Sequence, residues 1–270
     1  MTVPIEQRFP RPSVMGVVNV TPDSFSDGGV NFRAEDAIAA GRRMVEEGAA
    51  VVDLGGESTR PGSEGVSVEE ELGRVVPVLE GLRGLPVSID TAKAEVARVA
   101  VVDLGAVLVN DVTALRGDPG MAEVVAGSGA YLCLMHMQGE PRTMQLDPRY
   151  EDVVAEVAAF LEERLGFAVD AGIPEERICL DPGIGFGKTL EHNLELLRRL
   201  DEIAALGRPV LVGISRKSTL GRLLGGSEAP IATTAASVAA AVLAFERGAS
   251  ILRVHDVREH VEALTVAAAL

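Results

Sequence analysis

The sequence predicts one (β/α)8 TIM barrel in a single domain that spans residues 1–270. Three observations predict it. Eight short apolar runs rich in β-branched residues recur along the chain, helical patterns lie between them, and no linker or shift in composition divides the chain. The mean repeat of about 34 residues suits a strand, a helix and short loops. A doubly wound open sheet is the main alternative.

The predicted strands follow one another with helical segments between them. They are residues 14–20, 50–56, 86–91, 106–112, 130–136, 177–183, 209–215 and 250–256. Among the intervening segments, residues 34–48, 66–82 and 150–172 have clear helical patterns. The strands are almost entirely apolar, as expected where helices cover a parallel sheet. A Gly-Ala pair opens four of them, and we expect its glycine to close the preceding helix in the left-handed conformation, at Gly48, Gly105, Gly129 and Gly248.

The composition excludes several classes of function. The net charge of −15 argues against a nucleic-acid partner and against an anionic membrane surface. We see neither a signal peptide nor a membrane span, which makes a cytoplasmic protein the expectation. Cys133 and Cys179 lie inside apolar runs and are predicted to be reduced core residues.

Each predicted strand ends at a polar group. Because the carboxyl ends of parallel barrel strands share one face, we expect these groups to surround a single mouth. Strands also end in polar residues simply because they reach solvent there, but the opposite ends of these strands carry Gly, Ala and Pro. That asymmetry indicates a functional site. The groups are Asn19, Asp53, Asp90, Asn110, His136, Asp181, Ser215, Arg253 and His255.

The charged groups at this mouth suit a substrate that carries both hydrogen-bond donors and an anion. Asp90, Asn110 and Asp181 need donors, which protein cations or the N–H groups of a 2-aminopyrimidine supply; purely structural ion pairs are the alternative. Arg253 and His255 point to the same side of the last strand and form, with Lys217, a cationic group for a phosphate or diphosphate.

The other candidate residues are a metal ligand, two lysines and two aromatic residues. Asn19 offers a neutral oxygen for Mg²⁺, whereas no cluster has zinc spacing, His192 is expected on a helix and His260 on the surface. The three lysines all follow a strand, but Lys93 and Lys188 are as compatible with local ion pairs as with a function.

Two long polar loops, residues 19–29 and 53–65, are candidate lids. Phe25 in the first and Phe186 after the sixth strand are aromatic rings that either pin a loop or cover a ligand.

Taken in order, eight segments resemble the dihydropteroate synthase family over nearly the whole chain. They are MGVVNVTPDSFSDGG, DLGGESTRPG, SIDT, VNDVTA, MHMQGEPRTMQ, DPGIGFGKT, GISRKS and RVHDV. The resemblance implies a (β/α)8 barrel that joins 4-aminobenzoate to 6-hydroxymethyl-7,8-dihydropterin diphosphate. The implied products are 7,8-dihydropteroate, a folate precursor, and diphosphate, and the implied cofactor is Mg²⁺.

The resemblance also implies a role for each matching position. The pterin would be held by Asp90, Asn110, Asp181 and Lys217. The diphosphate would be held by Arg253, His255 and, through Mg²⁺, Asn19. The 4-aminobenzoate site would comprise Phe25, Thr59, Arg60, Pro61, Phe186 and Ser218. Catalysis would stabilise the leaving diphosphate and the electron-poor pterin, through Arg253, His255, Lys217, Asp90 and Asp181, without a catalytic base.

Three other functions remain open at this point. A methyltransferase of the related pterin-binding barrels would use the same Asp and Asn set but leaves Arg253 and His255 unexplained. A Schiff-base lyase would act through Lys217. A non-enzymatic pterin-binding protein would bind without turnover. Independently, residues 231–245 form a largely apolar stretch, which predicts a homodimer through the C-terminal helices.

Overall fold

The computed structural model describes residues 3–21, 34–58, 63, 65–225 and 232–270. Its eight strands are parallel and close into a barrel in sequence order, with β1 pairing β8. The strands are β1 (Ser13–Asn19), β2 (Val51–Gly55), β3 (Val87–Asp90), β4 (Leu108–Asp111), β5 (Tyr131–Met135), β6 (Ile178–Asp181), β7 (Val210–Val212) and β8 (Ala249–Val254). The predicted TIM barrel is confirmed, and closure excludes the open sheet.

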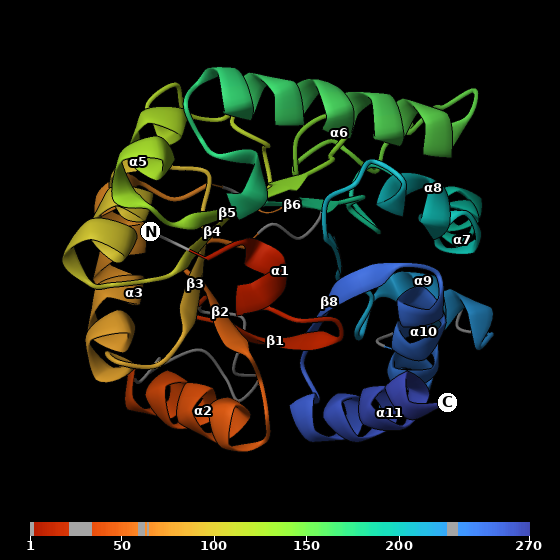
Figure 1. Ribbon diagram of the computed structural model, residues 1–270, viewed down its shortest axis with the longest axis horizontal. Helices are drawn as coiled ribbons and strands as arrows, with labels where there is room; N and C mark the ends of the chain where they lie inside the picture. The colour runs from red at the N-terminus through yellow and green to blue at the C-terminus, as the bar shows by residue number, and fades with distance from the viewer. Residues whose placement is uncertain (1–2, 22–33, 59–62, 64, 226–231) are drawn as a thin grey trace.

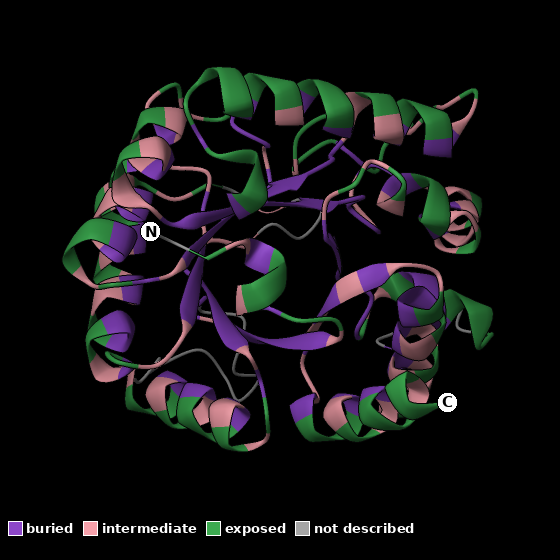
Figure 2. Ribbon diagram, in the orientation of Figure 1, coloured by how far each residue is buried: buried purple, intermediate pink, exposed green. Residues whose placement is uncertain are grey.

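Helices surround the barrel, with buried faces toward the strands and exposed faces outward (Figure 2). The α-helices are α1 (Ile5–Arg8), α2 (Ala34–Glu46), α3 (Val68–Gly81), α4 (Ala94–Arg98), α5 (Met121–Ser128), α6 (Val153–Asp170), α7 (Leu190–Arg198), α8 (Leu200–Ala204), α9 (Ser218–Leu223), α10 (Thr234–Glu246) and α11 (Val257–Ala269). Two short turns of other helix types are η1 (Val99–Asp103) and η2 (Glu175–Arg177). The three predicted helices correspond to α2, α3 and α6, and side-chain caps at Ser67 and Asp152 fix where α3 and α6 begin.

The short helix α1 closes the amino-terminal end of the barrel, where Figure 1 shows it in front of the strands. Ile5 and Phe9 are 0% and 1% exposed and belong to a cluster with inward-facing strand residues such as Met15 and Leu211. With this end filled by apolar side chains, polar side chains lie toward the carboxyl-terminal end. We call α1 and the following Phe9 the N-terminal plug, and no pattern in the sequence indicated it.

The local predictions are mostly confirmed, with one exception. All four glycines of the Gly-Ala pairs have positive φ, as predicted. Cys133 and Cys179 are free, buried and paired in register on β5 and β6. The prediction of a surface position for His260 is wrong, because its side chain is fully buried and its Nδ1 lies 2.6 Å from the Asp256 carbonyl oxygen. Within the described residues, no helix is long and apolar enough to cross a membrane.

Candidate active site at the carboxyl ends of the strands

The ends of β1, β2 and β3 bring Asn19 and Asp90 to opposite sides of Gly55. A side chain at Gly55 would place its Cβ 3.5 Å from Asn19 Oδ1 and 3.7 Å from Asp90 Oδ2. Strand register pairs Asn19 with Gly55 and Gly55 with Asp90. Because Gly55 has no side chain, a small space remains between these two side-chain oxygen atoms.

Arg253 on β8 connects the acidic residues of β2 and β3. Its Nε lies 2.6 Å from Asp53 Oδ2, and its Nη2 lies 2.8 Å from Asp90 Oδ2. Asn110 on β4 donates from Nδ2 to the same Asp53 oxygen at 3.0 Å. The predicted residues Asp90, Asn110 and Arg253 are thus one hydrogen-bonded group, and Asp53 lies at its centre.

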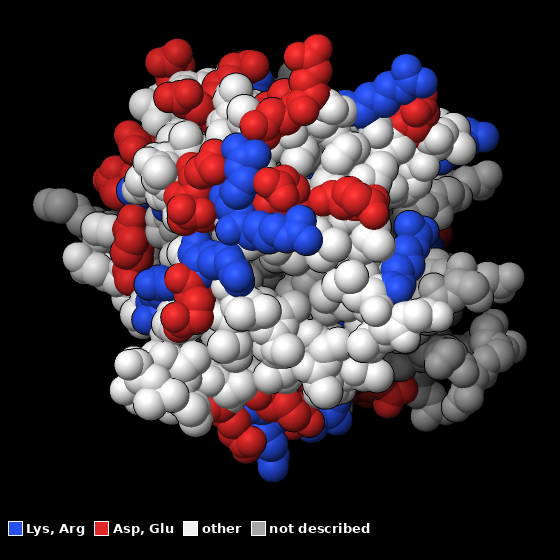
Figure 3. Space-filling model, turned by 90° about the vertical axis from the view of Figure 1, so that its right-hand side faces the viewer, with Lys and Arg blue, Asp and Glu red and all other residues white. Residues whose placement is uncertain are grey.

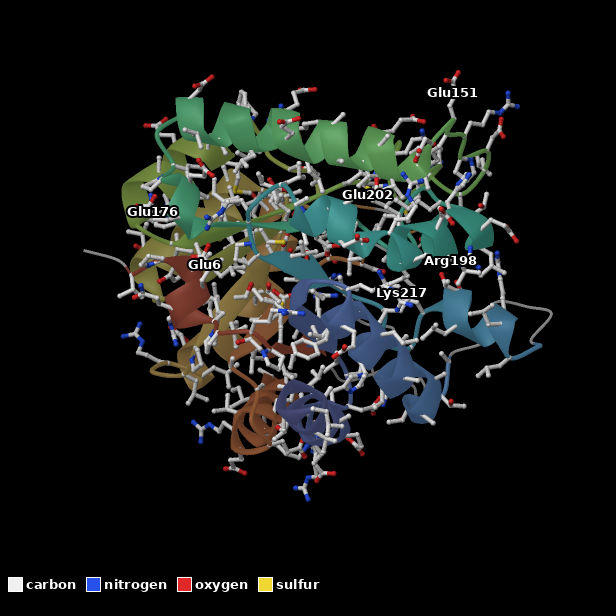
Figure 4. All side chains as sticks on the ribbon, turned by 45° about the vertical axis from the view of Figure 1, so that its right-hand side comes forward. Glu6, Glu151, Glu176, Arg198, Glu202 and Lys217 are labelled. Carbon is white, nitrogen blue, oxygen red and sulfur yellow. The ribbon has the colours of Figure 1, made fainter. Side chains whose placement is uncertain are left out.

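The loop after β6 brings Asp181, Phe186 and Lys217 together. Asp181 Oδ1 accepts a hydrogen bond from the Gly183 backbone N–H at 2.7 Å. Lys217 Nζ donates to the carbonyl oxygen of Ile184 and lies 4.7 Å from the centre of the Phe186 ring. Figure 4 shows Lys217 on the opposite side of the barrel from Glu6 of α1. A cation, a carboxylate and an aromatic face therefore border the same mouth.

Burial shifts the charge states of these groups toward neutrality. It raises the pKa of Asp90 to about 7, although Arg253 opposes the shift. Burial also raises the pKa of Asp181, which the positive charge of Lys217 partly offsets. Burial lowers the pKa of Lys217 to about 8. The site thus holds poorly solvated acceptors that gain from N–H donors on a ligand.

His255 lies beside Ser215 and Arg253. Its Nδ1 lies 3.1 Å from Ser215 Oγ. Burial and the nearby charge of Arg253 lower the pKa of the imidazole to about 4. This shift disfavours a positive charge on His255 without a ligand, and its part in the cationic group stays a prediction.

Two buried groups at this face were not assigned roles from the sequence. Asp53 is fully buried, and Lys188 is 3% exposed. Lys188 Nζ lies 2.8 Å from His136 Nδ1 and donates to the carbonyl oxygens of Gly183 and Phe186, both at 3.0 Å. Lys188 thus holds the loop that carries Phe186. Its position after a strand was visible in the sequence, but its acceptors are mostly backbone carbonyls, which no side-chain pattern reveals.

The remaining 4-aminobenzoate candidates are less well defined. Ser218 is exposed and begins α9, next to Lys217. Phe25, Thr59, Arg60 and Pro61 lie outside the described residues. Nor do the described residues contain a group of three or more His, Cys, Asp or Glu side chains placed to hold a metal ion. A metal held by the described residues alone would therefore depend on few protein ligands.

Comparison with known proteins agrees with this site. Residues 15–255 match the family of pterin binding enzymes. The chain is 49% identical over 258 residues to the dihydropteroate synthase of Escherichia coli, which covers 94% of this chain and 90% of that protein. This chain belongs to the dihydropteroate synthase family.

Solved structures of the family share the fold of this chain. The Yersinia pestis synthase, solved with a sulfonamide drug, aligns with a TM-score of 0.90 at 46% identity and covers 97% of this chain and 94% of that one. The Xanthomonas albilineans synthase with 4-aminobenzoic acid aligns with a TM-score of 0.88 at 52% identity, covering 97% and 93%. A second structure of the Xanthomonas albilineans enzyme, with 7,8-dihydropteroate, aligns with a TM-score of 0.84 at 47% identity, covering 97% and 93%.

Proposed function

We propose that this protein is a transferase that condenses 6-hydroxymethyl-7,8-dihydropterin diphosphate with 4-aminobenzoate, giving 7,8-dihydropteroate and diphosphate. The group formed by Asp53, Asp90, Asn110 and Arg253 carries the proposal, because it places acceptors for a pterin edge beside a cation for a diphosphate. The complexes of the Xanthomonas albilineans relatives with 4-aminobenzoic acid and 7,8-dihydropteroate support the same substrates.

The residues divide the work according to charge. Asp90, Asn110 and Asp181 accept N–H groups of the pterin, and Lys217 donates to it. As the bond between the pterin methylene carbon and the diphosphate oxygen breaks, the carbon becomes positive, and the electrons of the bond leave with the diphosphate. Arg253 stabilises this leaving group, and neutral His255 donates one N–H to it. The amine of 4-aminobenzoate attacks the carbon and then releases a proton to solvent.

We further propose that Asn19 holds the Mg²⁺ that accompanies the diphosphate. Its Oδ1 borders the small space at Gly55, with Asp90 Oδ2 on the other side of that space. Mg²⁺ prefers oxygen ligands, retains several waters and is often shared with substrate phosphates, so one or two protein oxygens suffice. When bound, the metal offsets negative charge on the diphosphate.

The first test measures diphosphate release from the dihydropterin diphosphate with Mg²⁺, with and without 4-aminobenzoate, and identifies the organic product by mass. Release together with 7,8-dihydropteroate is the expected result. Tight pterin binding with no release would refute the synthase and favour the pterin-binding protein or the methyltransferase. Trapping of a carbonyl substrate on Lys217 by borohydride would instead support the lyase.

We also propose that the protein forms a homodimer through α9, α10 and α11. These helices lie on the right-hand side of the molecule in Figure 1, and Figure 3, which shows that side, has a broad area without charged side chains. Leu223, Leu224, Leu243 and Val266 lie on or directly after these helices and are 52% to 62% exposed. A second copy of the chain matches such a face, because isologous contact covers identical apolar patches.

Sedimentation at micromolar concentration tests the homodimer. We expect a dimer that Leu243→Glu converts to a monomer, whereas Val102→Glu, at an exposed valine of η1, leaves it intact. A monomeric wild-type protein would refute the proposal.

The buried free cysteines also support a cytoplasmic location, where thiols stay reduced.

A further inference from the structure

We propose that Asp53 is a positioning residue that fixes the orientation of the Asn110 side-chain amide and so makes Asn110 an acceptor toward the pterin. This inference rests on the proposed function. It concerns a residue with no assigned role, and it explains why a neutral amide rather than a third carboxylate stands at position 110 of β4.

Both hydrogen-bond partners of Asp53 are donors. The side chain is fully buried, and its Oδ2 accepts from Arg253 Nε at 2.6 Å and from Asn110 Nδ2 at 3.0 Å. A guanidinium has only donors to offer, so Oδ2 is an acceptor toward Arg253. The same oxygen therefore accepts from Asn110.

The Asn110 amide is oriented as a consequence. An amide presents its N–H groups on one side and its oxygen on the other. With Nδ2 held by Asp53, the oxygen points away from Asp53, and Asn110 Oδ1 is buried with no hydrogen-bond partner among the described residues. A buried acceptor without a partner is costly, and a ligand N–H at this position removes that cost.

The strand register places the amide oxygen at the site and Asp53 below it. Register pairs Asp90 on β3 with Asn110 on β4, so the two residues are neighbours at the same level of the barrel. Asp53 pairs with Ser88, two residues before Asp90 on β3, and so lies one layer deeper in the barrel. Asp53 thus acts on the pterin through Asn110 rather than by touching the ligand.

A pair of isosteric substitutions tests the inference. Asp53→Asn keeps one oxygen, which takes the place of Asp53 Oδ2 and accepts from both Arg253 Nε and Asn110 Nδ2. Its NH2 group then lies at the place of Asp53 Oδ1, which has no hydrogen-bond partner among the described residues. The orientation of the Asn110 amide is therefore retained. Asp53→Leu removes the acceptor, so nothing holds Asn110 Nδ2, and the amide is free to turn its NH2 group toward the pterin.

The measurement is equilibrium binding of 6-hydroxymethyl-7,8-dihydropterin, which lacks the diphosphate. We expect Asp53→Leu to bind it roughly 10 to 100 times more weakly and Asp53→Asn to stay within about threefold of wild type. The KM for 4-aminobenzoate should change less than about twofold in both, because the proposed function places this amide at the pterin rather than at 4-aminobenzoate. Asp103→Asn, which neutralises an exposed carboxylate on η1, is the matched control.

Binding by Asp53→Asn as weak as binding by Asp53→Leu would overturn the inference, because the charge of Asp53 rather than its hydrogen bond to Asn110 would then matter. Equal binding by Asp53→Leu and wild type would overturn it as well. If Asp53→Leu fails to fold, the wild-type protein still provides a test, because the Asn110 side-chain N–H signals, assigned from their loss in Asn110→Ala, should exchange slowly with solvent. Fast exchange would refute the hydrogen bond to Asp53. Failure of wild-type protein to bind the dihydropterin would instead refute the proposed function.

Discussion

Replacement of Gly183 by alanine should disrupt the loop that supports Asp181. Gly183 has φ of +66°, and a Cβ there would lie 1.9 Å from the backbone carbonyl oxygen of His136. The left-handed conformation costs an alanine about 1–2 kcal/mol. Relief of the overlap requires a backbone shift, which costs about 1–3 kcal/mol more. The sum is about 2–5 kcal/mol.

Gly207→Ala is the matched control for this prediction. Gly207 has a similar φ of +80° but no heavy atom within 4 Å of its Cβ position, and it lies at the other end of the barrel, before β7. It should show only the conformational cost of about 1–2 kcal/mol. Comparison of the two variants therefore isolates the overlap with His136.

Thermal unfolding and pterin binding together provide the assay. For a chain of this length, 1 kcal/mol corresponds to about 2 °C in Tm, so we expect a decrease of about 4–10 °C for Gly183→Ala and about 2–4 °C for Gly207→Ala. Only Gly183→Ala should also weaken dihydropterin binding, because the Gly183 N–H contacts Asp181. Equal decreases in Tm with unchanged binding would refute the reasoning.

Burial and charge lead to three further predictions. The raised pKa of Asp90 means that the folded state takes up its proton more readily than the unfolded state, so the contribution of Asp90 to the free energy of unfolding should increase as pH is lowered from 8 toward 5. The lowered pKa values of His136 and His255 act in the opposite direction over this range, so the measurement is the difference between the wild-type and Asp90→Asn curves; parallel curves would refute the prediction. Lys93→Met leaves fully buried Glu71 without the Lys93 Nζ contact at 2.6 Å and should lower stability by about 3–5 kcal/mol, and the added Glu71→Gln change should recover most of the loss; no recovery would refute the charge argument. Phe9→Ala should lower stability by about 3–5 kcal/mol in urea unfolding while leaving KM values unchanged, since Phe9 fills the end of the barrel opposite the site; a changed KM would contradict this separation.

The barrel and most of its site could be predicted because parallel strands carry their own signal. Apolar runs that end in polar residues place Asp90, Asn110 and Arg253 at one mouth, and the structure joins them through hydrogen bonds. Asp53 also fits that pattern, but its role depends on which atom of Asn110 it contacts. A sequence pattern gives the face of a strand but not the direction of an amide.

Other features depend on tertiary contacts that no local pattern encodes. The neutral state of His255 results from its burial beside Arg253. The N-terminal plug was missed because α1 has only four residues, and its stability comes from burial of Ile5 and Phe9 in the barrel rather than from helical periodicity. His260 sits in a polar-looking stretch but faces inward on α11.

The pairing of β1 with β8 has a consequence for biosynthesis. Ser13–Asn19 leaves the ribosome roughly 230 residues before its partner Ala249–Val254. At 5–20 residues per second, roughly 10–50 s pass between the two. Throughout this interval the N–H and C=O groups along one edge of β1 lack their native partner, and unpaired strand edges template association with other chains. Nascent chains of this protein therefore depend on protection of that edge, and slower translation lengthens the period in which it is needed.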